Sequence, residues 1–400
     1  MKYRQAIAAL YKLSLFGSVL GLERIKELEQ KLGWPERSFK CILVAGSNGK
    51  GSTATMIARS LEEAGYRTGL YLSPHVDDFR ERISINGKKI GGREVAEEYS
   101  RVAAVARKMK PQATFFEILT AMALDYFARR KVEWAVLEVG LGGRLDAANI
   151  VEPELSVITR VDLEHTDKLG RTLAEIAREK AGIMRNGKFV ITGAEGEGLS
   201  ALKRLASEKK AKLVVARGRY EGKLAMMGEH QKKNAAVAKK ALQMLGVPKN
   251  AITRGLAHTI LPARLEVMGR KPLVIHDGAH NPAAMKQLAE EIRRMKLAKS
   301  KLILVFGAMK DKDFDAMLHE IAPLASEVIV NQARLERAAR AGELAQAARK
   351  YNKRVRVVKD VRESARKARK LAGKNGAVLA TGSIYMLSEL RGKNRLRVTM

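Results

Sequence analysis

The feature that most constrains the fold of this chain is a regular alternation of short apolar segments with longer amphipathic ones. Residues 40–46 (KCILVAG), 132–140 (VEWAVLEVG) and 154–161 (ELSVITRV) have the pattern of buried strands. Strands that are apolar throughout, and that alternate with helices, are typical of a parallel sheet covered by helices on both faces. We therefore predict a doubly wound α/β fold for the first part of the chain. Its further elements are strands at 67–73, 188–193 and 212–216 and helices at 113–130 and 172–184.

The same alternation starts again after Pro262, with apolar segments such as PLVIHDG, KLILVFGAM and AVLATG. A chain of 400 residues is also too long for one ordinary core. We predict two domains, an N-terminal domain over residues 1–261 with a mostly parallel sheet and a smaller Rossmann-like α/β domain over 262–400. The segment 261–267 (LPARLEV) is the candidate hinge. Ligands of such sheets bind beyond the carboxyl ends of the strands, so the site is expected there, in the cleft between the domains.

The composition of the chain indicates its cellular compartment. No apolar run reaches the roughly 18 residues that a membrane helix needs. The N-terminal stretch is amphipathic and carries Glu23, Glu27 and Glu29, which favours a helix of the mature protein over a signal peptide. Cys41 is the only cysteine, so an intrachain disulfide and a cysteine-based metal site are excluded. These features predict a cytoplasmic protein without a membrane partner.

The formal net charge of +32 allows two interpretations. One is a nucleic-acid or other polyanionic partner, and the other is a solvated surface rich in lysine and arginine. Residues 331–400 hold 19 Lys and Arg against 5 Asp and Glu, but their only aromatic residues are Tyr351 and Tyr385. Because bases stack on aromatic side chains, this scarcity favours the solvated surface and no specific nucleic acid.

The strongest local motif is a glycine-rich loop at residues 45–53 (AGSNGKGST), between a predicted strand and a predicted helix. Glycines let the backbone approach phosphate oxygens, and the helix N-terminus offers free N–H groups with a partial positive charge. Lys50 can neutralise the β- and γ-phosphates. The spacing departs from the standard phosphate loop, because Gly51 directly follows the lysine. The residues predicted to bind the nucleotide here are Ser47, Asn48, Gly49, Lys50, Gly51 and Ser52.

Polar side chains follow the strands of the same sheet. Glu138 ends an apolar strand, where an unpaired carboxylate is expensive to bury. His165, with Asp162 and Asp167 nearby, comes just after the next strand, and Ser73 ends another. Hard oxygen ligands beside a phosphate loop suit Mg²⁺. A structural histidine and a carboxylate that caps a strand end are the alternatives, and a surface lysine is the alternative for Lys180.

These residues together resemble the folylpolyglutamate synthase/dihydrofolate synthase family of the Mur ligase superfamily. The resemblance covers most of the chain, although the stretch between Ala216 and Gly228 is short for that family and Ser47 stands where threonine is usual. The motifs that carry it include LGLERIKELEQKLG, VAGSNGKGST, YLSPHVDDFRERISING, TFFEILTAMALDYF, LEVGLGGRLDAANIV, DLEHTDKLG, IAREKAGI, GEHQKKNAA, LPARLE, HDGAHNP, GAMKDKD and TGSIYM.

The resemblance implies roles that the sequence pattern does not itself indicate. ATP would be bound by the phosphate loop, by Gln231 and Asn234, and by Arg264 and Asp277 of the hinge and second domain. Two Mg²⁺ ions would be held, one by Ser73 and Glu138 and the other by His165 and a carbamylated Lys180. Lys50, Glu138, His165, Lys180 and His280 would be catalytic. The residues implied to bind the acceptor acid and glutamate are Pro74, His75, Arg82, Phe116, His280, Asn281 and Ser383.

The activity that the resemblance implies is ATP-dependent ligation of L-glutamate to dihydropteroate, to a folyl(poly)glutamate, or to both. The enzyme would act as a monomer, through an acyl phosphate of the acceptor. A Mur-like ligase for another pterin or coenzyme acid is the alternative within the same chemistry. A basic nucleic-acid-binding ATPase with a phosphate loop is the alternative from another class.

Overall fold

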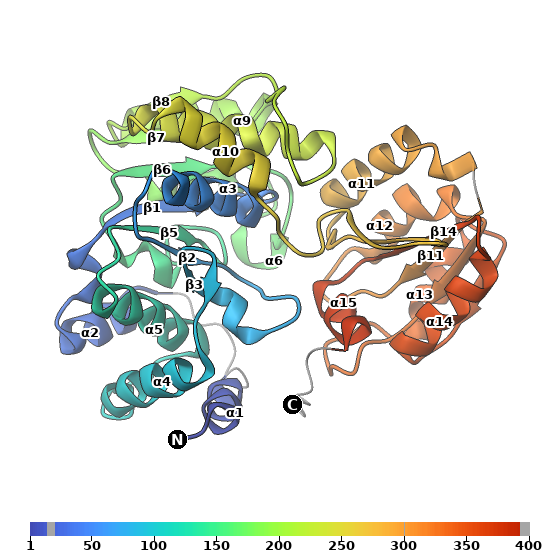
Figure 1. Cartoon of the computed structure of the whole chain (residues 1–400), viewed down its shortest axis with the longest axis horizontal. Coiled ribbons are helices and arrows are strands. Elements are labelled where there is room, and N and C mark those ends of the chain that lie inside the picture. The colour runs from blue at the N-terminus through green and yellow to red at the C-terminus, as the bar shows by residue number, and fades with distance from the viewer. Residues whose placement is uncertain (14–20, 300, 393–400) are drawn as a thin grey trace. The chain divides into compact units, whose positions relative to one another are not determined.

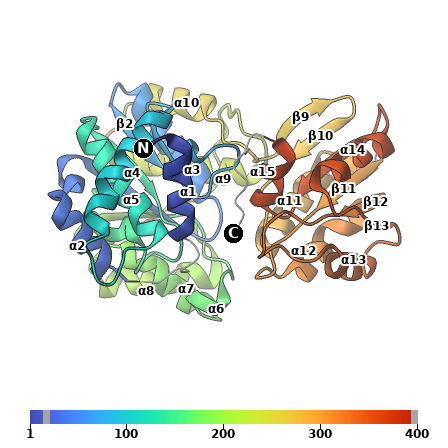
Figure 2. The same ribbon diagram turned by 90° about the horizontal axis from the view of Figure 1, so that it is seen from below.

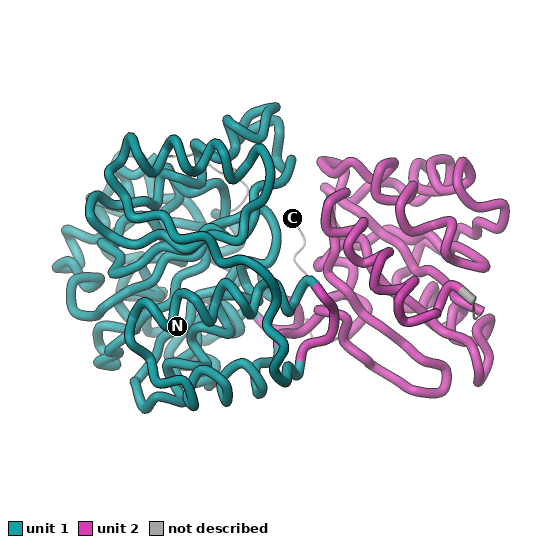
Figure 3. Tube along the Cα trace, turned by 90° about the horizontal axis from the view of Figure 1, so that it is seen from above, with its two compact units in different colours: residues 1–75, 79–225, 230–260 teal, residues 76–78, 226–229, 261–400 magenta. Residues whose placement is uncertain are grey.

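The computed structural model describes residues 1–13, 21–299 and 301–392. They form two compact units (Figure 3). Unit 1 contains residues 1–75, 79–225 and 230–260, and unit 2 contains 76–78, 226–229 and 261–400. Within the described residues, no helix is both long enough and apolar enough to cross a membrane.

Unit 1 is built on an eight-stranded sheet with the strand order β4-β3-β2-β5-β1-β6-β7-β8. The six strands from β2 to β8 in this order run parallel, and β3 and β4 add an antiparallel edge. The strands are β1 (Lys40–Ala45), β2 (Thr68–Tyr71), β3 (Ile83–Ile85), β4 (Lys88–Lys89), β5 (Trp134–Glu138), β6 (Leu155–Ile158), β7 (Phe189–Thr192) and β8 (Lys212–Val215).

The helices of this part of the chain cover the sheet. Helix α3 is mostly buried, because it packs against the central strands and against α10 (Figure 1). Helices α1, α2 and α5 all pack against α4. The helices are α1 (Tyr3–Leu13), α2 (Glu23–Leu32), α3 (Lys50–Glu63), α4 (Gly92–Ala106), α5 (Phe115–Arg129), α6 (Thr166–Leu169), α7 (Leu173–Lys180), α8 (Gly196–Glu208), α9 (Glu229–Met244) and α10 (Lys249–His258). Short 3₁₀ turns are η2 (Pro35–Ser38), η3 (Phe79–Arg82), η4 (Ala147–Ile150) and η5 (Ala181–Ile183).

Unit 2 has a six-stranded sheet with the order β13-β12-β11-β14-β10-β9, parallel except for the edge strand β9. The strands are β9 (Glu266–Arg270), β10 (Leu273–His276), β11 (Leu302–Phe306), β12 (Glu327–Val330), β13 (Val355–Val357) and β14 (Ala377–Thr381). The helices are α11 (Pro282–Arg294), α12 (Phe314–Ile321), α13 (Ala341–Arg349), α14 (Val361–Ala372) and α15 (Ile384–Arg391), with 3₁₀ turns η6 (Leu297–Lys299) and η7 (Ala322–Leu324).

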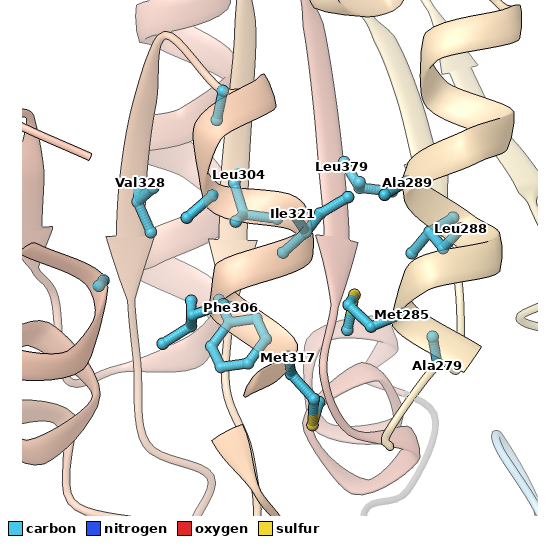
Figure 4. Packing of buried hydrophobic residues seen from close by; sticks show 14 of the residues in the cluster. Ala279, Met285, Leu288, Ala289, Leu304, Phe306, Met317, Ile321, Val328 and Leu379 are labelled. Carbon is cyan, nitrogen blue, oxygen red and sulfur yellow. The ribbon is translucent and has the colours of Figure 1, made fainter. Parts of the chain in front are cut away.

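Two apolar cores cover the two faces of this second sheet. Along β11, Leu302, Leu304 and Phe306 join one core and the alternate residues Ile303 and Val305 join the other, because successive strand side chains point to opposite faces. Figure 4 shows the first core, which includes residues of α11, α12 and α13. Helices α14 and α15 contribute to the second core. Figure 2 shows α12 and α13 on one side of the sheet and α14 on the other.

The predicted fold class is confirmed: both sheets are mostly parallel and each is covered by helices. Sequence reasoning missed the antiparallel edges formed by β3 and β4 and by β9, because β3 and β4 have only three and two residues and β9 is largely exposed, so they carry little apolar pattern. The helix predicted at 172–184 ends earlier, since α7 stops at Lys180 and a 3₁₀ turn follows. The predicted N-terminal helix corresponds to α1 and α2, and residues 14–20 lie outside the described residues.

Candidate active site

The glycine-rich loop lies between the end of β1 and the start of α3. Gly46 and Gly49 both have positive φ, at 142° and 86°. A Cβ on Gly46 would lie 1.9 Å from the hydroxyl of Thr159, and one on Gly49 would lie 2.4 Å from the amide oxygen of Asn234. Both positions therefore require glycine for conformation and for space.

The loop is tied to the end of the neighbouring strand β6. The Ser47 hydroxyl donates to the Asp162 carbonyl at 2.9 Å and accepts from the Asp162 N–H at 2.9 Å. The Asn48 amide donates to the Asp162 carboxylate at 3.0 Å, and the Thr159 hydroxyl donates to the Asn48 carbonyl at 2.7 Å. These bonds hold the loop in place before any ligand arrives, which is the preorganisation that phosphate binding favours.

Lys50 is the first residue of α3, a helix of 14 residues. Its ammonium donates to the Gly46 carbonyl at 2.9 Å and so folds back over the loop. Its positive charge helps to lower the pKa of Glu164 and partly opposes the rise in the pKa of Asp146 that burial causes. Ser52 is buried in the first turn of the same helix. A lysine, glycine-rich backbone and the N-terminus of a long helix form a site suited to polyphosphate.

Ser73 and Glu138 are brought together by the pairing of β2 with β5. Tyr71 pairs with Leu137, so the next residues along both strands leave the sheet at the same edge. The backbone N–H of Ser73 donates to the Glu138 carboxylate at 2.9 Å. Glu138 is only 5% exposed. The carboxylate of Glu138 and the hydroxyl of Ser73 are oxygen donors of the kind that a hard divalent cation prefers.

Lys180 is fully buried at the end of α7 and donates to the Glu164 carboxylate at 2.7 Å. Burial lowers the pKa of Lys180, with Lys50 adding to the effect and Glu164 opposing it. Burial would raise the pKa of Glu164, but Lys50 and Lys180 outweigh it and hold that pKa below its ordinary value. Sequence reasoning named the neighbours Asp162 and Asp167 and missed Glu164, because only the fold shows which carboxylate meets the lysine.

His165 precedes the short helix α6, next to Glu164, in the left-handed backbone region with φ of 45°. Asp167 lies in the first turn of α6. In the part of the chain that the structure describes, no three His, Cys, Asp or Glu side chains are grouped so that they could hold a metal ion. A cation at this edge would therefore need the Ser73 hydroxyl, a modified Lys180 or phosphate oxygens among its ligands.

Asp146 organises the loop that follows Glu138. Its carboxylate accepts backbone N–H bonds from Gly140, Leu141 and Ala148 at 2.9 to 3.0 Å. Burial raises the pKa of Asp146 to about 6, although these N–H donors and Lys50 lower it. Sequence reasoning did not single out Asp146. The available signal was its place in the LDAAN motif directly after the strand that carries Glu138.

A group of aromatic and basic side chains surrounds His75. The Arg82 guanidinium donates to Nδ1 of His75 at 2.8 Å, and the Tyr11 hydroxyl lies 3.5 Å from Nε2. The Tyr11 ring stacks on Phe115 with 5.7 Å between centroids. The guanidinium carbon of Arg82 lies 5.8 Å from the centre of the Phe115 ring. A planar ring with polar edges suits such surroundings, because it can stack and form hydrogen bonds.

Of the residues predicted for the acceptor, Pro74 precedes His75, and Phe116 lies beside Tyr71 with 6.2 Å between ring centroids. Sequence reasoning missed Tyr11, which α1 contributes from 64 residues before His75. Nothing in the spacing of the sequence signals that approach.

Gln231 and Asn234 lie one turn apart on α9 and are both buried. The Asn234 amide donates to the Gln231 side-chain oxygen at 3.1 Å. Because Asn234 also lies against Gly49, this pair borders the phosphate loop.

All the predicted residues of unit 2 except Arg264 follow β10 or β14, two strands that pair with each other. Asp277 accepts backbone N–H bonds from Leu265 at 2.8 Å and from Ala279 at 2.9 Å. It therefore holds the chain beside Arg264, whose guanidinium donates to the Ala263 carbonyl at 3.3 Å. Nδ1 of His280 lies 2.8 Å from the Gly278 carbonyl oxygen.

Asn281 and Ser383 each cap the N-terminus of a helix of unit 2. Asn281 accepts from the N–H of Ala284 and caps α11, with Pro282 as the first helical residue. Ser383 accepts from the N–H of Tyr385 and caps α15. Each cap directs a helix N-terminus toward the carboxyl end of the sheet of unit 2, where anions are favoured.

Comparison with known families defines the class of the chain. A family model described as the Mur ligase middle domain matches residues 44–234. A second model, described as the Mur ligase glutamate ligase domain, matches residues 263–384. The sheet that bears the phosphate loop and the smaller α/β unit after it are therefore those of a Mur-type ligase.

Relatives identify the family within this class. The Bacillus subtilis dihydrofolate synthase/folylpolyglutamate synthase is 34% identical over 97% of this chain and 98% of its own length. A probable bifunctional folylpolyglutamate synthase/dihydropteroate synthase of Haloferax volcanii is 36% identical over 98% of this chain, and the chain spans about half (50%) of that relative's length. The solved Yersinia pestis bifunctional folylpolyglutamate synthase/dihydrofolate synthase, complexed with AMPPNP and Mn ion, has a TM-score of 0.89 at 30% identity, with 98% of each chain covered. The chain belongs to the folylpolyglutamate synthase/dihydrofolate synthase family.

Proposed function

We propose that this chain is an ATP-dependent ligase that joins L-glutamate to a folate-type carboxylic acid. One observation carries the proposal: the lysine-bearing loop, the Ser73–Glu138 pair and the Lys180–Glu164 pair all follow parallel strands of one sheet. A polyphosphate site and buried carboxylates at one edge are what activation of an acid by ATP requires. The Yersinia pestis relative was solved with a nucleotide analogue and a divalent ion, which supports the use of ATP and a divalent metal.

In the first step, an oxygen of the acceptor carboxylate attacks the γ-phosphorus of ATP. The bond from that phosphorus to the bridging oxygen breaks and ADP leaves, which produces an acyl phosphate. Lys50 and the N–H groups of the loop from Ser47 to Ser52 neutralise the charge that spreads over the transferring phosphoryl group. Gln231 and Asn234 hold the nucleotide from α9, and Arg264 and Asp277 contribute from unit 2.

Mg²⁺ fits the residues of this edge by its preference for hard oxygen ligands. We propose Ser73 and Glu138 as ligands of one ion, and His165 and a carbamylated Lys180 as ligands of a second. When bound, these ions would supply positive charge to the phosphate oxygens. Lys180 is a suitable residue for carbamylation because burial lowers its pKa, which favours the neutral amine that reacts with carbon dioxide.

In the second step, the amine of L-glutamate attacks the acyl carbon, loses a proton, and phosphate leaves as the amide forms. We assign His280, Asn281 and Ser383 to the incoming glutamate. The helix N-termini capped by Asn281 and Ser383 favour the carboxylates of that substrate. Exclusion of water would protect the acyl phosphate from hydrolysis.

For the acceptor we propose the segment from Pro74 to Arg82 together with Phe116, and we add Tyr11 because it stacks on Phe115 and approaches His75. The names of the relatives support dihydropteroate and folylpolyglutamates as acceptors. We assign residues 1–261 to the ATP-binding domain and residues 262–400 to the glutamate-ligase domain. The proposed working form is a cytoplasmic monomer.

The test is phosphate release with ATP, Mg²⁺ and L-glutamate, compared among dihydropteroate, tetrahydrofolate and no acceptor. We expect release that requires both glutamate and an acceptor, and the preferred acceptor identifies the first substrate. Release that is independent of any pterin, or that requires DNA or RNA, would contradict the proposal. Release only with a different acid would favour the Mur-like alternative.

A further inference from the structure

One arginine near the end of the described chain holds two carboxylates that lie far from it in the sequence. Arg391 is the last residue of α15, and its side chain is only 5% exposed. Its Nε lies 2.5 Å from Oδ1 of Asp77, and its Nη2 donates to Oδ2 of Asp77 at 3.1 Å. Its Nη1 and Nη2 donate to the two carboxylate oxygens of Glu266 at 2.5 and 3.1 Å. The guanidinium therefore contacts both oxygens of both acids.

The Asp77 partner lies in the middle of the segment proposed to bind the acceptor. Residues 76–78 belong to unit 2, whereas His75 and Phe79 on either side belong to unit 1. Val76 packs in a core of unit 2 with residues such as Ile384 and Leu387 of α15. The backbone between His75 and Arg82 is thus anchored at its centre by an apolar contact and an ion pair, both within unit 2.

The Glu266 partner connects the same arginine to the chain around Arg264. Glu266 begins β9, and its carboxylate also accepts from the N–H of Ala263 at 2.8 Å. Burial would raise the pKa of Glu266, but hydrogen bonds from Arg391 and Ala263 outweigh it and lower that pKa.

His276 lies close enough to this cluster for Arg391, Glu266, Asp77 and also Arg369 to affect its pKa. His276 is buried, and burial together with the charge of Arg391 lowers its pKa to about 4, with Glu266 and Asp77 opposing. His276 is therefore neutral at physiological pH. Arg391 is the cation that directly contacts both Asp77 and Glu266, and its planar fork can bind both at once, which a lysine cannot do.

We propose that Arg391 is a positioning residue for the acceptor acid, because it fixes Asp77 at the centre of the segment that carries Pro74, His75 and Arg82. The proposal rests on the proposed function for the identity of the acceptor, a pterin-bearing carboxylic acid. Arg391 itself takes no part in phosphoryl transfer. Its loss loosens the segment and weakens acceptor binding, while the phosphate loop of unit 1 keeps its affinity for ATP.

The experiment compares two variants. Arg391→Lys keeps the positive charge but removes the planar guanidinium that contacts both carboxylates, and Asp77→Asn leaves α15 unchanged. We expect either change to raise KM for the acceptor about tenfold, since a charge-assisted hydrogen bond is lost. KM for ATP and kcat should stay within about twofold, because Lys50 and the loop are untouched. The matched control is Arg334→Lys, since Arg334 also meets two carboxylates of unit 2, Asp360 and Glu389, but is exposed. The Arg334→Lys variant should leave KM for the acceptor, KM for ATP and kcat unchanged.

A second readout uses the free protein and requires no substrate. Amide hydrogen exchange should quicken across residues 73–82 in Arg391→Lys and in Asp77→Asn, and stay unchanged across the phosphate loop at 46–52. Unchanged exchange in the segment, or a lower melting temperature with an unchanged acceptor KM, would overturn the positioning role. If the wild-type protein shows no acceptor-dependent turnover, the proposed function fails, and the exchange measurement still decides whether Arg391 orders the segment.

Discussion

Glu164 and Glu29 are both buried glutamates of unit 1, yet their surroundings shift their pKa values in opposite directions. Glu164 lies at the site edge, where Lys50 and Lys180 overcome the effect of burial and lower its pKa. Glu29, on α2, is fully buried, and burial raises its pKa to about 9, with the carboxylates of Glu36 and Asp125 adding to the shift. The comparison teaches that nearby cations, rather than burial alone, decide whether a buried acid is ionised.

The region around Glu29 does contain arginines, but they lie at its rim. Arg129 contacts Glu98 at 2.6 Å and Arg101 contacts Asp125 at 3.2 Å, and both guanidiniums are about half exposed. Burial and the nearby Asp125 still raise the pKa of Glu98 to about 8. At the site edge, by contrast, Lys180 is completely buried beside its partner. The site therefore concentrates charged groups, whereas in the helical layer burial raises the pKa values of Glu29 and Glu98 above neutral pH.

The largest expected effect comes from Lys50→Ala, which removes the cation of the phosphate loop. We expect kcat to fall by about 10²- to 10³-fold, because the variant loses the positive charge that stabilises the transferring phosphoryl group. The measurement is phosphate release, with circular dichroism to establish that the fold remains. Activity like that of the wild type would show that Lys50 does not contact the nucleotide. Glu138→Ala should likewise lose activity and keep its fold.

Lys180→Ala removes the buried partner of Glu164 and the proposed carbamate ligand. We expect a loss of activity of about 10²-fold, by analogy with other catalytic groups. A short carboxylic acid such as formate should restore part of it, because it can occupy the position of the carbamate, whereas added bicarbonate should restore little. Mass spectrometry and high-resolution density for the wild-type protein provide the control. An unmodified Lys180 at full activity would restrict its role to the ion pair with Glu164.

Glu29→Gln tests the prediction that burial keeps Glu29 protonated, in contrast to Glu164. The unfolded chain ionises Glu29 near its ordinary pKa of 4.5, whereas the folded chain keeps the proton up to about pH 9. The contribution of Glu29 to stability is therefore fully present below pH 4.5 and is lost as pH rises toward 9, by at most about 1.4 kcal/mol per pH unit. The Gln variant should unfold at a higher temperature at pH 8 and show a flatter pH dependence.

Urea unfolding of the wild type and Glu29→Gln between pH 5 and pH 9 supplies that measurement. If the two proteins lose stability in parallel as pH rises, Glu29 is ionised in the folded state and the contrast with Glu164 disappears. Phosphate release should be unchanged in this variant, because α2 contributes none of the proposed site residues.

The smallest effect is expected for Glu97→Gln, because Glu97 is a surface acid, in contrast to the buried acids Glu164 and Glu29. Glu97 pairs with Arg93 one turn away on α4 at 2.7 Å, and the Arg93 side chain is 92% exposed. Such pairs contribute about 0.3–0.5 kcal/mol, since water and salt screen them. The melting temperature should change by no more than about 1 °C at physiological salt. A larger change would mean that the surface charges of this basic protein are coupled.

The sequence allowed many of the local features to be predicted. The apolar segments predicted the central strands of both sheets, and the glycine-rich loop predicted where α3 begins, because strand periodicity and turn chemistry are local properties. That Ser73 and Glu138 lie at one edge was predicted from a parallel sheet, but their direct contact depends on the pairing of β2 with β5.

Only the tertiary structure decided which distant side chains meet. Three contacts join segments that are distant in the sequence. Tyr11 approaches His75 across 64 residues, Glu164 pairs with Lys180 across 16, and Arg391 contacts Asp77 across 314. Such contacts depend on how elements pack and on which rotamers fit, so no local pattern encodes them. The sequence by itself determined the strands, the loop and the edge at which chemistry occurs. Packing determined which carboxylates stay charged there, because the dielectric surroundings and cation neighbours of a side chain exist only after the chain has folded.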